Sequence, residues 1–178
     1  MTQEIYQEAI KFAGDKHKNQ KVPGTDSNYL LHISNVAMEI ILASKEDGNF
    51  DINYAVQLAL LHDTLEDTET NYEEVSEKFG KKVAIGVEAL TKNENLVSKK
   101  ERMVDSLHRI NQLQKEVGMV KIADRITNLQ EPPKHWDKEK IRNYYNEAKL
   151  INENLKDKCC YLTNRLLTKI GEYKKYTV

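Results

Sequence analysis

The segment LLHDTLEDTET, residues 60–70, concentrates ionisable side chains beside leucines. On a helix, where each residue turns by about 100°, four of them project within one arc of less than half the circumference: His62, Asp63, Glu66 and Asp67. Like charges at this spacing destabilise a helix, so the face calls for a neutralising cation. Imidazole nitrogen and carboxylate oxygen together suit Mn, Fe, Zn or Co. The segment therefore predicts a metal site, for which His62 and Asp63 supply only two of the ligands.

Two other ionisable residues lie in apolar surroundings and could complete such a site. His32, one of the five histidines in the chain, lies in the apolar stretch YLLHISNVA. Asp124 lies in the apolar stretch MVKIADRITNL, and Asn128 follows four residues later on the same helical face. Each has a plainer explanation when taken alone. His32 could be a hydrogen-bonded core histidine, Asp124 could pair with Arg125 at the surface, and HDTLEDT could be a solvated helix end. Their joint occurrence favours the metal site.

The composition places the chain among ordinary folded proteins. It has 178 residues, 39% hydrophobic and 31% charged, and a formal net charge of −1. This length suits one domain, so we expect a single domain over residues 1–178. The charge balance gives no indication of nucleic acid or membrane partners. Adjacent cysteines without metal-type spacing, and an N-terminus without a signal-like apolar run, favour a cytoplasmic location.

The apolar spacing is helical along the whole chain, and only seven glycines and three prolines interrupt it. Thr70 and Glu73 have the spacing of a capping box, and Gly80 suits a left-handed helix C-cap. We expect an all-α bundle of about nine helices, over residues 3–17, 30–43, 52–67, 70–79, 81–90, 98–110, 113–130, 137–155 and 157–172.

The ordered set His32, His62-Asp63 and Asp124 resembles the H…HD…D pattern of the HD-domain metal-dependent phosphohydrolases. More closely, the stretches LLHDTLEDTETNYEEVSEKFG and MVKIADRITNL are similar to the hydrolase domain of the RelA/SpoT family and to small stand-alone alarmone hydrolases. HKNQ…YLLHISNVA resembles the N-terminal motif of the same proteins. The resemblance spans residues 5 to about 150. It implies an HD-domain helical bundle and an enzyme of the stringent response.

The resemblance also implies roles for individual residues. One divalent metal ion, typically Mn²⁺, would be held by His32, His62, Asp63 and Asp124. Glu66 and Asp67 match the catalytic pair of the family, with the division of acid and base work between them left open. The substrate contacts implied are Lys21, Lys99 or its neighbour Lys100, Asn128, Lys140 and Tyr144.

The activity that the resemblance implies is removal of pyrophosphate from the ribose 3′ oxygen of ppGpp or pppGpp, a small-molecule nucleotide. The chain departs from the family at Val22 and Pro23, where basic residues are common, and at Lys140, where arginine is common. These departures leave open another nucleotide, such as ppApp, NADPH at its 2′ phosphate, or a deoxynucleotide. A module that binds a nucleotide without turnover is a third hypothesis. A homodimer is compatible with all three.

Overall fold

The computed structural model describes residues 2–178. Within them the regular secondary structure is helical, apart from one isolated bridge between Lys21 and Asn28. The expected all-α fold is confirmed. The elements are α1 (Gln3–Lys16), α2 (Leu30–Glu46), α3 (Ile52–Leu61), α4 (Thr64–Asp67), α5 (Tyr72–Phe79), α6 (Lys81–Leu90), α7 (Lys99–Asn111), α8 (Lys115–Asn128), α9 (Lys138–Leu155), α10 (Cys160–Tyr173) and the 3₁₀ turn η1 (Lys174–Tyr176).

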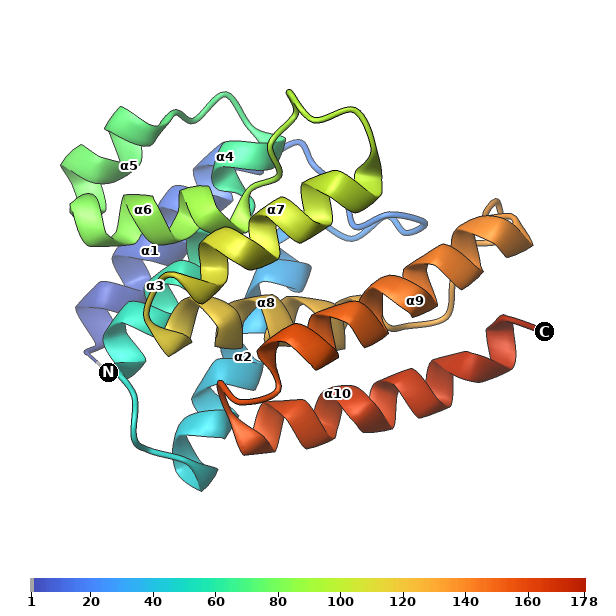
Figure 1. Cartoon of the computed structure of the whole chain (residues 1–178). Helices are drawn as coiled ribbons and strands as arrows, with labels where there is room; N and C mark the ends of the chain where they lie inside the picture. Colours follow the sequence, from blue (N-terminus) through green and yellow to red (C-terminus); the bar gives the residue numbers. More distant parts are fainter. Residues whose placement is uncertain (1) are drawn as a thin grey trace.

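Helix α8 is the centre of the bundle. Every residue from Glu116 to Ile126 is buried, and the helix contacts α2, α3, α6, α7, α9 and α10. Figure 1 shows α8 in the middle, with α9 and α10 running side by side on one flank and α5 and α6 at the opposite end. A helix that is buried all round must satisfy its own polar groups internally. Glu116 does so by accepting a hydrogen bond from the backbone N–H of Asp51, at 2.8 Å.

The single helix expected over residues 52–67 is wrong, because the chain breaks there into α3 and α4. The hydroxyl of Thr64 donates to the carbonyl of Leu61 at 2.7 Å, and Thr64 is fully buried. A side-chain hydroxyl that donates to a backbone carbonyl in this way competes with the backbone hydrogen bonds of the helix. His62 and Asp63 therefore lie in the turn between the two helices, with different orientations from those of a continuous helix.

Helix α5 begins one residue later than the sequence suggested. Its N-cap is Asn71, whose side chain accepts from the backbone N–H of Glu74 at 2.9 Å. Thr70 is instead buried and bonded to the hydroxyl of Thr68 at 2.7 Å, so the capping box expected from Thr70 and Glu73 is wrong. A capping box does occur at the start of α7, between Ser98 and Glu101.

Gly80, which ends α5, has the positive φ that its position suggested, at 89°. Its ψ of 153° places it outside the left-handed helical region that was expected. Glycine is still favoured there because other residues rarely adopt positive φ. The chain can therefore turn at once from α5 into α6.

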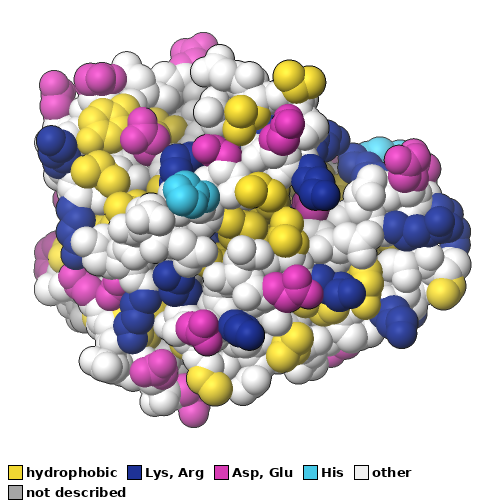
Figure 2. Space-filling model, viewed as in Figure 1, with side chains coloured by type: hydrophobic (Ala, Val, Ile, Leu, Met, Phe, Trp, Pro, Cys, Tyr) yellow, Lys and Arg dark blue, Asp and Glu magenta, His cyan; other side chains and the backbone are white. Residues whose placement is uncertain are grey.

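The surface outside the core is polar and mixed in charge. Figure 2 shows acidic and basic side chains interspersed over one face of the molecule. In the part of the chain that the structure describes, no helix combines the length and the apolarity needed to cross a membrane.

An ion pair between a buried carboxylate and a partly exposed arginine joins α2 to α10. Glu39 is only 2% exposed, and both of its carboxylate oxygens accept from the guanidinium of Arg165, each at 2.6 Å. Bidentate pairing of this kind fixes geometry as well as charge. It holds α10 against α2 on the side of the bundle where α2 carries His32.

We predict that Arg165→Ala lowers the free energy of unfolding by about 2 kcal/mol, because it leaves the Glu39 carboxylate buried without a partner. Urea denaturation followed by circular dichroism would measure the change. The double variant Glu39→Met with Arg165→Ala should recover part of the loss, since no buried charge remains. A double variant less stable than Arg165→Ala would contradict this reading of the pair.

Candidate metal centre and active site

Three helical segments bring imidazole and carboxylate groups to one buried point. His32 lies in the first turn of α2, His62 in the turn after α3, and Asp124 near the end of α8. The Nε2 atoms of His32 and His62 are 3.3 Å apart, and they lie 3.4 and 3.8 Å from Oδ1 of Asp124. Ligand atoms of the three residues all lie within 4.8 Å of one another, close enough to hold one metal ion.

Asp63 lies beside this group. Its Oδ2 is 2.9 Å from Nε2 of His62 and 3.7 Å from Nε2 of His32. The same oxygen accepts a hydrogen bond from the Tyr29 hydroxyl at 2.5 Å. Two imidazoles and two carboxylates at such distances fit a divalent cation, which suits mixed nitrogen and oxygen donors.

The donors are oriented by further hydrogen bonds. Nδ1 of His62 lies 2.8 Å from the carbonyl of Ala59, and Nδ1 of His32 lies 3.3 Å from the hydroxyl of Thr127. A neutral imidazole that donates from Nδ1 presents the lone pair of Nε2, as a metal ligand must. The side-chain amide of Asn128 donates to Oδ1 of Asp124. These partners hold both rings with Nε2 toward the same point.

The electrostatics of the cluster show a site that concentrates negative charge. Burial by itself lowers the pKa of His62, but the carboxylates of Asp63 and Asp124 outweigh it and raise that pKa to about 9. Burial raises the pKa of Asp63, yet the facing His62 imidazolium lowers it well below the usual range. Burial and Asp63 together raise the pKa of Tyr29 far above normal, so its hydroxyl remains a donor. A proton on His62 thus takes the place of part of a cation's charge.

The two acidic residues of α4 point to different partners. Glu66 accepts from the side chain of Lys92 at 2.5 Å and from the backbone N–H of Lys92 at 3.1 Å. Asp67 is exposed and accepts from the amide of Gln20 at 2.8 Å. Burial, and then the charge of Asp63, raise the pKa of Asp67. The expected single arc with His62 and Asp63 is wrong in detail, because the chain breaks before α4.

A cavity of about 630 Å³ adjoins Glu66. Its walls carry two aromatic side chains, Trp136 and Tyr144, and charged side chains of both signs. The basic ones are Lys92, Lys99, Arg102 and Lys140, and the acidic ones are Glu66, Glu94, Asp137, Glu139 and Glu147. The structure therefore places Lys99, Lys140 and Tyr144 together, as the sequence suggested. It adds Lys92 and Arg102, for which the sequence gave no signal beyond their charge.

A second cavity, of about 590 Å³, begins at His32 and shares Trp136 and Tyr144 with the first. Asn128 lines it, together with Val22 and Pro23. Lys21 is not among its lining residues, and pairs instead with exposed Asp26 at 2.7 Å. The loop before α2 thus presents apolar side chains to this cavity.

Tyr144, at the junction of the two cavities, rests on a buried arginine. The guanidinium of Arg125 lies 4.2 Å from the centre of the Tyr144 ring, and its Nη2 lies 3.3 Å from Glu147. Arg125 is 5% exposed, so it supports the wall and does not face solvent. The plainer alternative, a surface pair of Asp124 with Arg125, is therefore wrong, because both are buried on α8.

An all-α bundle that brings imidazole and carboxylate donors from three segments to one buried point defines a metal-binding helical domain. The chain belongs to the HD domain family, whose model matches residues 9–157. Membership implies a divalent metal, and His32, His62 and Asp124 could hold it.

Within this family, the chain is similar to curated pyrophosphohydrolases. The chain is 32% identical over 164 residues to the guanosine-3′,5′-bis(diphosphate) 3′-pyrophosphohydrolase MESH1 of Xenopus tropicalis, covering 89% of each. It is 32% identical over 165 residues to the human enzyme of the same name, covering 90% of this chain and 87% of that one. The solved structure of a metazoan orthologue of SpoT that hydrolyses ppGpp matches with a TM-score of 0.82 at 26% identity, over 97% of both chains. The expected resemblance is confirmed.

The raised pKa of His62 predicts how the stability of the metal-free protein depends on pH. Because the folded pKa of about 9 lies above the ordinary value of 6.5, its contribution is complete below pH 6.5 and is lost as pH rises through 9. We expect metal-free protein to lose on the order of 2 kcal/mol of unfolding free energy between pH 6.5 and 9.5. Denaturation at both pH values would measure it. Saturating Mn²⁺ should flatten the dependence, and equal stability of the metal-free protein at both pH values would contradict the assignment.

Proposed function

We propose that this protein is a Mn²⁺-dependent hydrolase that removes pyrophosphate from the ribose 3′ position of ppGpp or pppGpp. The observation that carries the proposal is the buried His32, His62 and Asp124 group, whose His32 lines a cavity that shares Trp136 and Tyr144 with the cavity carrying the lysines. The similarity to the MESH1 pyrophosphohydrolases supports the choice of substrate. The cytoplasm is the proposed location.

We assign the metal to His32, His62, Asp63 and Asp124. When bound, a divalent cation supplies a Lewis acid for the charge on phosphate and lowers the pKa of a water molecule. Tyr29 holds Asp63, and Asn128 holds Asp124, so both carboxylates are fixed before the cation arrives. Preorganised donors avoid a reorganisation cost during the reaction.

In the proposed reaction, water attacks the phosphorus bonded to the ribose 3′ oxygen. The bond from that phosphorus to the 3′ oxygen breaks, and the 3′ oxygen receives a proton. We assign Glu66, held by Lys92, to orienting the water and accepting its proton. We assign Asp67 to delivering a proton to the 3′ oxygen, because its raised pKa makes it the better proton carrier.

The substrate carries several phosphate charges, whereas the whole chain has a formal net charge of −1. The first cavity carries basic and acidic side chains together, so its lysines would contact phosphates one by one and not through a local excess of positive charge. Lys92, Lys99 and Lys140 are the proposed phosphate contacts. Arg102 is engaged differently, since its Nε donates to the carbonyl of Leu96 at 2.8 Å and so orders the loop that carries Lys92.

A second candidate is hydrolysis of another nucleotide by the same metal site. Val22 and Pro23, in place of basic residues, line the cavity next to His32 and favour this alternative. Lys21, an expected contact, lies outside both cavities. A panel of ppGpp, pppGpp, ppApp, NADPH and deoxynucleotides, each with Mn²⁺, would separate the candidates. Binding without turnover of any of them would favour the non-catalytic module.

We predict that the purified protein with Mn²⁺ releases pyrophosphate from ppGpp and that Asp63→Ala abolishes this activity, because a metal donor is lost. Pyrophosphate release can be measured by a coupled assay. The exposed neighbour Glu69 offers a matched control, since Glu69→Gln removes one charge from the same segment without touching the cluster. No turnover of ppGpp by the wild-type protein would overturn the proposal.

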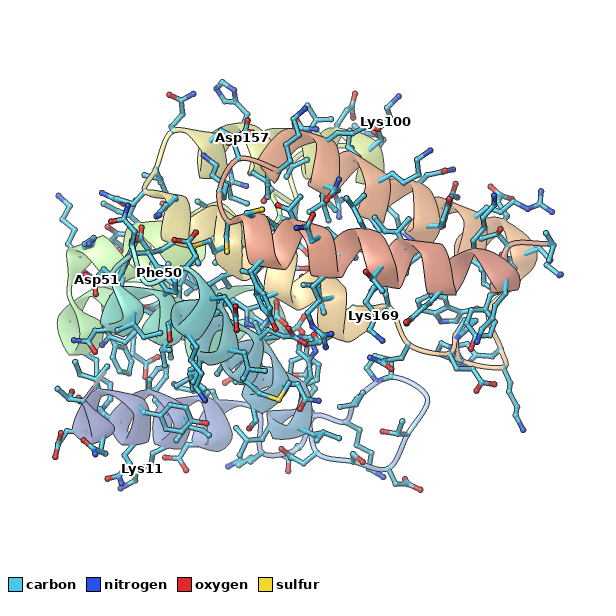
Figure 3. The ribbon with its side chains drawn as sticks, turned by 90° about the horizontal axis from the view of Figure 1, so that it is seen from below. Lys11, Phe50, Asp51, Lys100, Asp157 and Lys169 are labelled. Carbon is cyan, nitrogen blue, oxygen red and sulfur yellow. The ribbon has the colours of Figure 1, made fainter. Side chains whose placement is uncertain are left out.

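Lys99 and Lys100 provide an internal comparison. Lys99 lines the first cavity, whereas Lys100 lines only a neighbouring groove, and Figure 3 shows Lys100 at the outer rim of the molecule. We expect Lys99→Ala to raise KM for ppGpp about tenfold, the cost of one charge-assisted contact, and Lys100→Ala to change it less than about twofold. Steady-state kinetics would measure both. Equal effects of the two substitutions would argue against this cavity as the phosphate site.

A further inference from the structure

Gln20 connects the buried interior to the exposed carboxylate of Asp67. Its side-chain oxygen lies 2.5 Å from Nδ1 of His17, and its side-chain nitrogen donates to Oδ2 of Asp67 at 2.8 Å. The backbone of Gln20 is fixed as well. Its N–H donates to the carbonyl of His17 at 3.0 Å, and its carbonyl accepts from the N–H of Tyr29 at 2.9 Å. The amide is therefore presented to Asp67 from a rigid turn.

The direction of each hydrogen bond in this chain follows from Asp67. Oδ2 of Asp67 accepts, so the NH₂ group of Gln20 must face it and the carbonyl oxygen must face His17, and the proton that Asp67 is proposed to deliver is carried on Oδ1. His17 must then carry its proton on Nδ1. Burial lowers the pKa of His17, which keeps the ring neutral and leaves Nε2 as the unprotonated nitrogen. Reversing the amide would set its oxygen against the Asp67 carboxylate and its NH₂ against the Nδ1 proton.

The ring of His17 is itself held in the wall of the metal site. His17 is 1% exposed, and its ring centre lies 5.1 Å from that of Tyr29, whose hydroxyl donates to Asp63. One wall thus holds both carboxylates. Tyr29 fixes Asp63, and Gln20 fixes Asp67.

A structural role would not require this bond to Asp67. Asp67 ends the four-residue helix α4 and is exposed on one side, although partial burial raises its pKa, so water can reach the carboxylate when Gln20 is removed. A hydrogen bond at such a position contributes little to folding, about 1 kcal/mol or less. What the bond does fix is the direction of a flexible side chain beside the metal cluster.

We propose that Gln20 is a positioning residue that orients Asp67 for the reaction, and that His17 sets the orientation of the Gln20 amide. This inference rests on the proposed function, in which Asp67 delivers a proton to the leaving 3′ oxygen. Neither residue contacts the substrate. Their effect is to hold the Asp67 carboxyl in the geometry that proton transfer needs.

The first test is Gln20→Ala. We expect kcat for ppGpp to fall roughly tenfold to a hundredfold, because a misplaced catalytic group costs this much. KM and Mn²⁺ affinity should stay within about twofold of wild type, because the residue contacts neither substrate nor metal. The thermal midpoint should stay within a few degrees. Asn19→Ala, at the exposed neighbouring position, is the matched control and should leave kcat unchanged. An unchanged kcat in Gln20→Ala, or a loss explained by metal affinity, overturns the inference.

The second test is Gln20→Glu, which keeps the shape and changes only the donor. The introduced carboxyl can donate to Oδ2 of Asp67 only when it is protonated, and the neighbouring carboxyl of Asp67 raises its pKa. The activity of Gln20→Glu relative to Gln20→Ala should therefore rise as pH falls from 8 to about 5.5. A ratio that is independent of pH contradicts a donor role, because a purely structural defect would not recover on protonation.

A third measurement does not depend on activity. The ¹⁵N chemical shifts of His17 should report the Nδ1–H form in wild-type protein and a change in the tautomer balance in Gln20→Ala. If wild-type protein fails to hydrolyse ppGpp while His17 shows this pattern, the proposed function fails and the hydrogen-bonded chain stands. If His17 carries its proton on Nε2 in wild type, the chain itself is refuted.

Discussion

Two imidazoles and two carboxylates meet inside the bundle. Burying these carboxylates is electrostatically unfavourable, and the surrounding residues compensate for it. Asp124 projects from α8, which is buried from Glu116 to Ile126, where an unpaired charge would be strongly unfavourable. It is accommodated by Asn128, His32 and His62 around one carboxylate. Buried Lys121, whose Nζ lies 3.6 Å from Oδ2 of Asp124, also balances that charge, and the charges of Asp63 and Asp124 raise the pKa of His62.

The break between α3 and α4 gives the acidic segment two separate tasks. A continuous helix would have turned Glu66 and Asp67 toward the same side as His62 and Asp63. Because the chain turns at His62 and Asp63, those two residues face inward, while α4 directs Glu66 to Lys92 and Asp67 to Gln20. The carboxylates proposed for proton transfer are thus held from two different loops, and neither competes for a place in the metal cluster.

The two cavities differ in character, and Tyr144 lies between them. One carries lysines among acidic side chains, and the other presents Val22 and Pro23 beside His32. Arg125 supports Tyr144 from below without reaching solvent. The apolar character of the second cavity is the feature on which base preference would depend.

The sequence by itself determined the helical class and the residue types of the site. Helical periodicity was sufficient for the positions of most helices, because apolar spacing is a property of each segment alone. The motifs around His32, His62-Asp63 and Asp124 were sufficient to predict the cluster, and the structure brings His32, His62 and Asp124 within 4.8 Å of one another.

Tertiary structure decided the features that local sequence rules could not predict. It placed the cap of α5 at Asn71, broke the helix at His62 through the buried hydroxyl of Thr64, and removed Lys21 from the cavities. It also brought in Lys92 and Gln20 from loops 26 and 47 residues away from their acidic partners. A hydrogen bond across such a separation depends on how the helices pack, and no short window of the sequence carries that information.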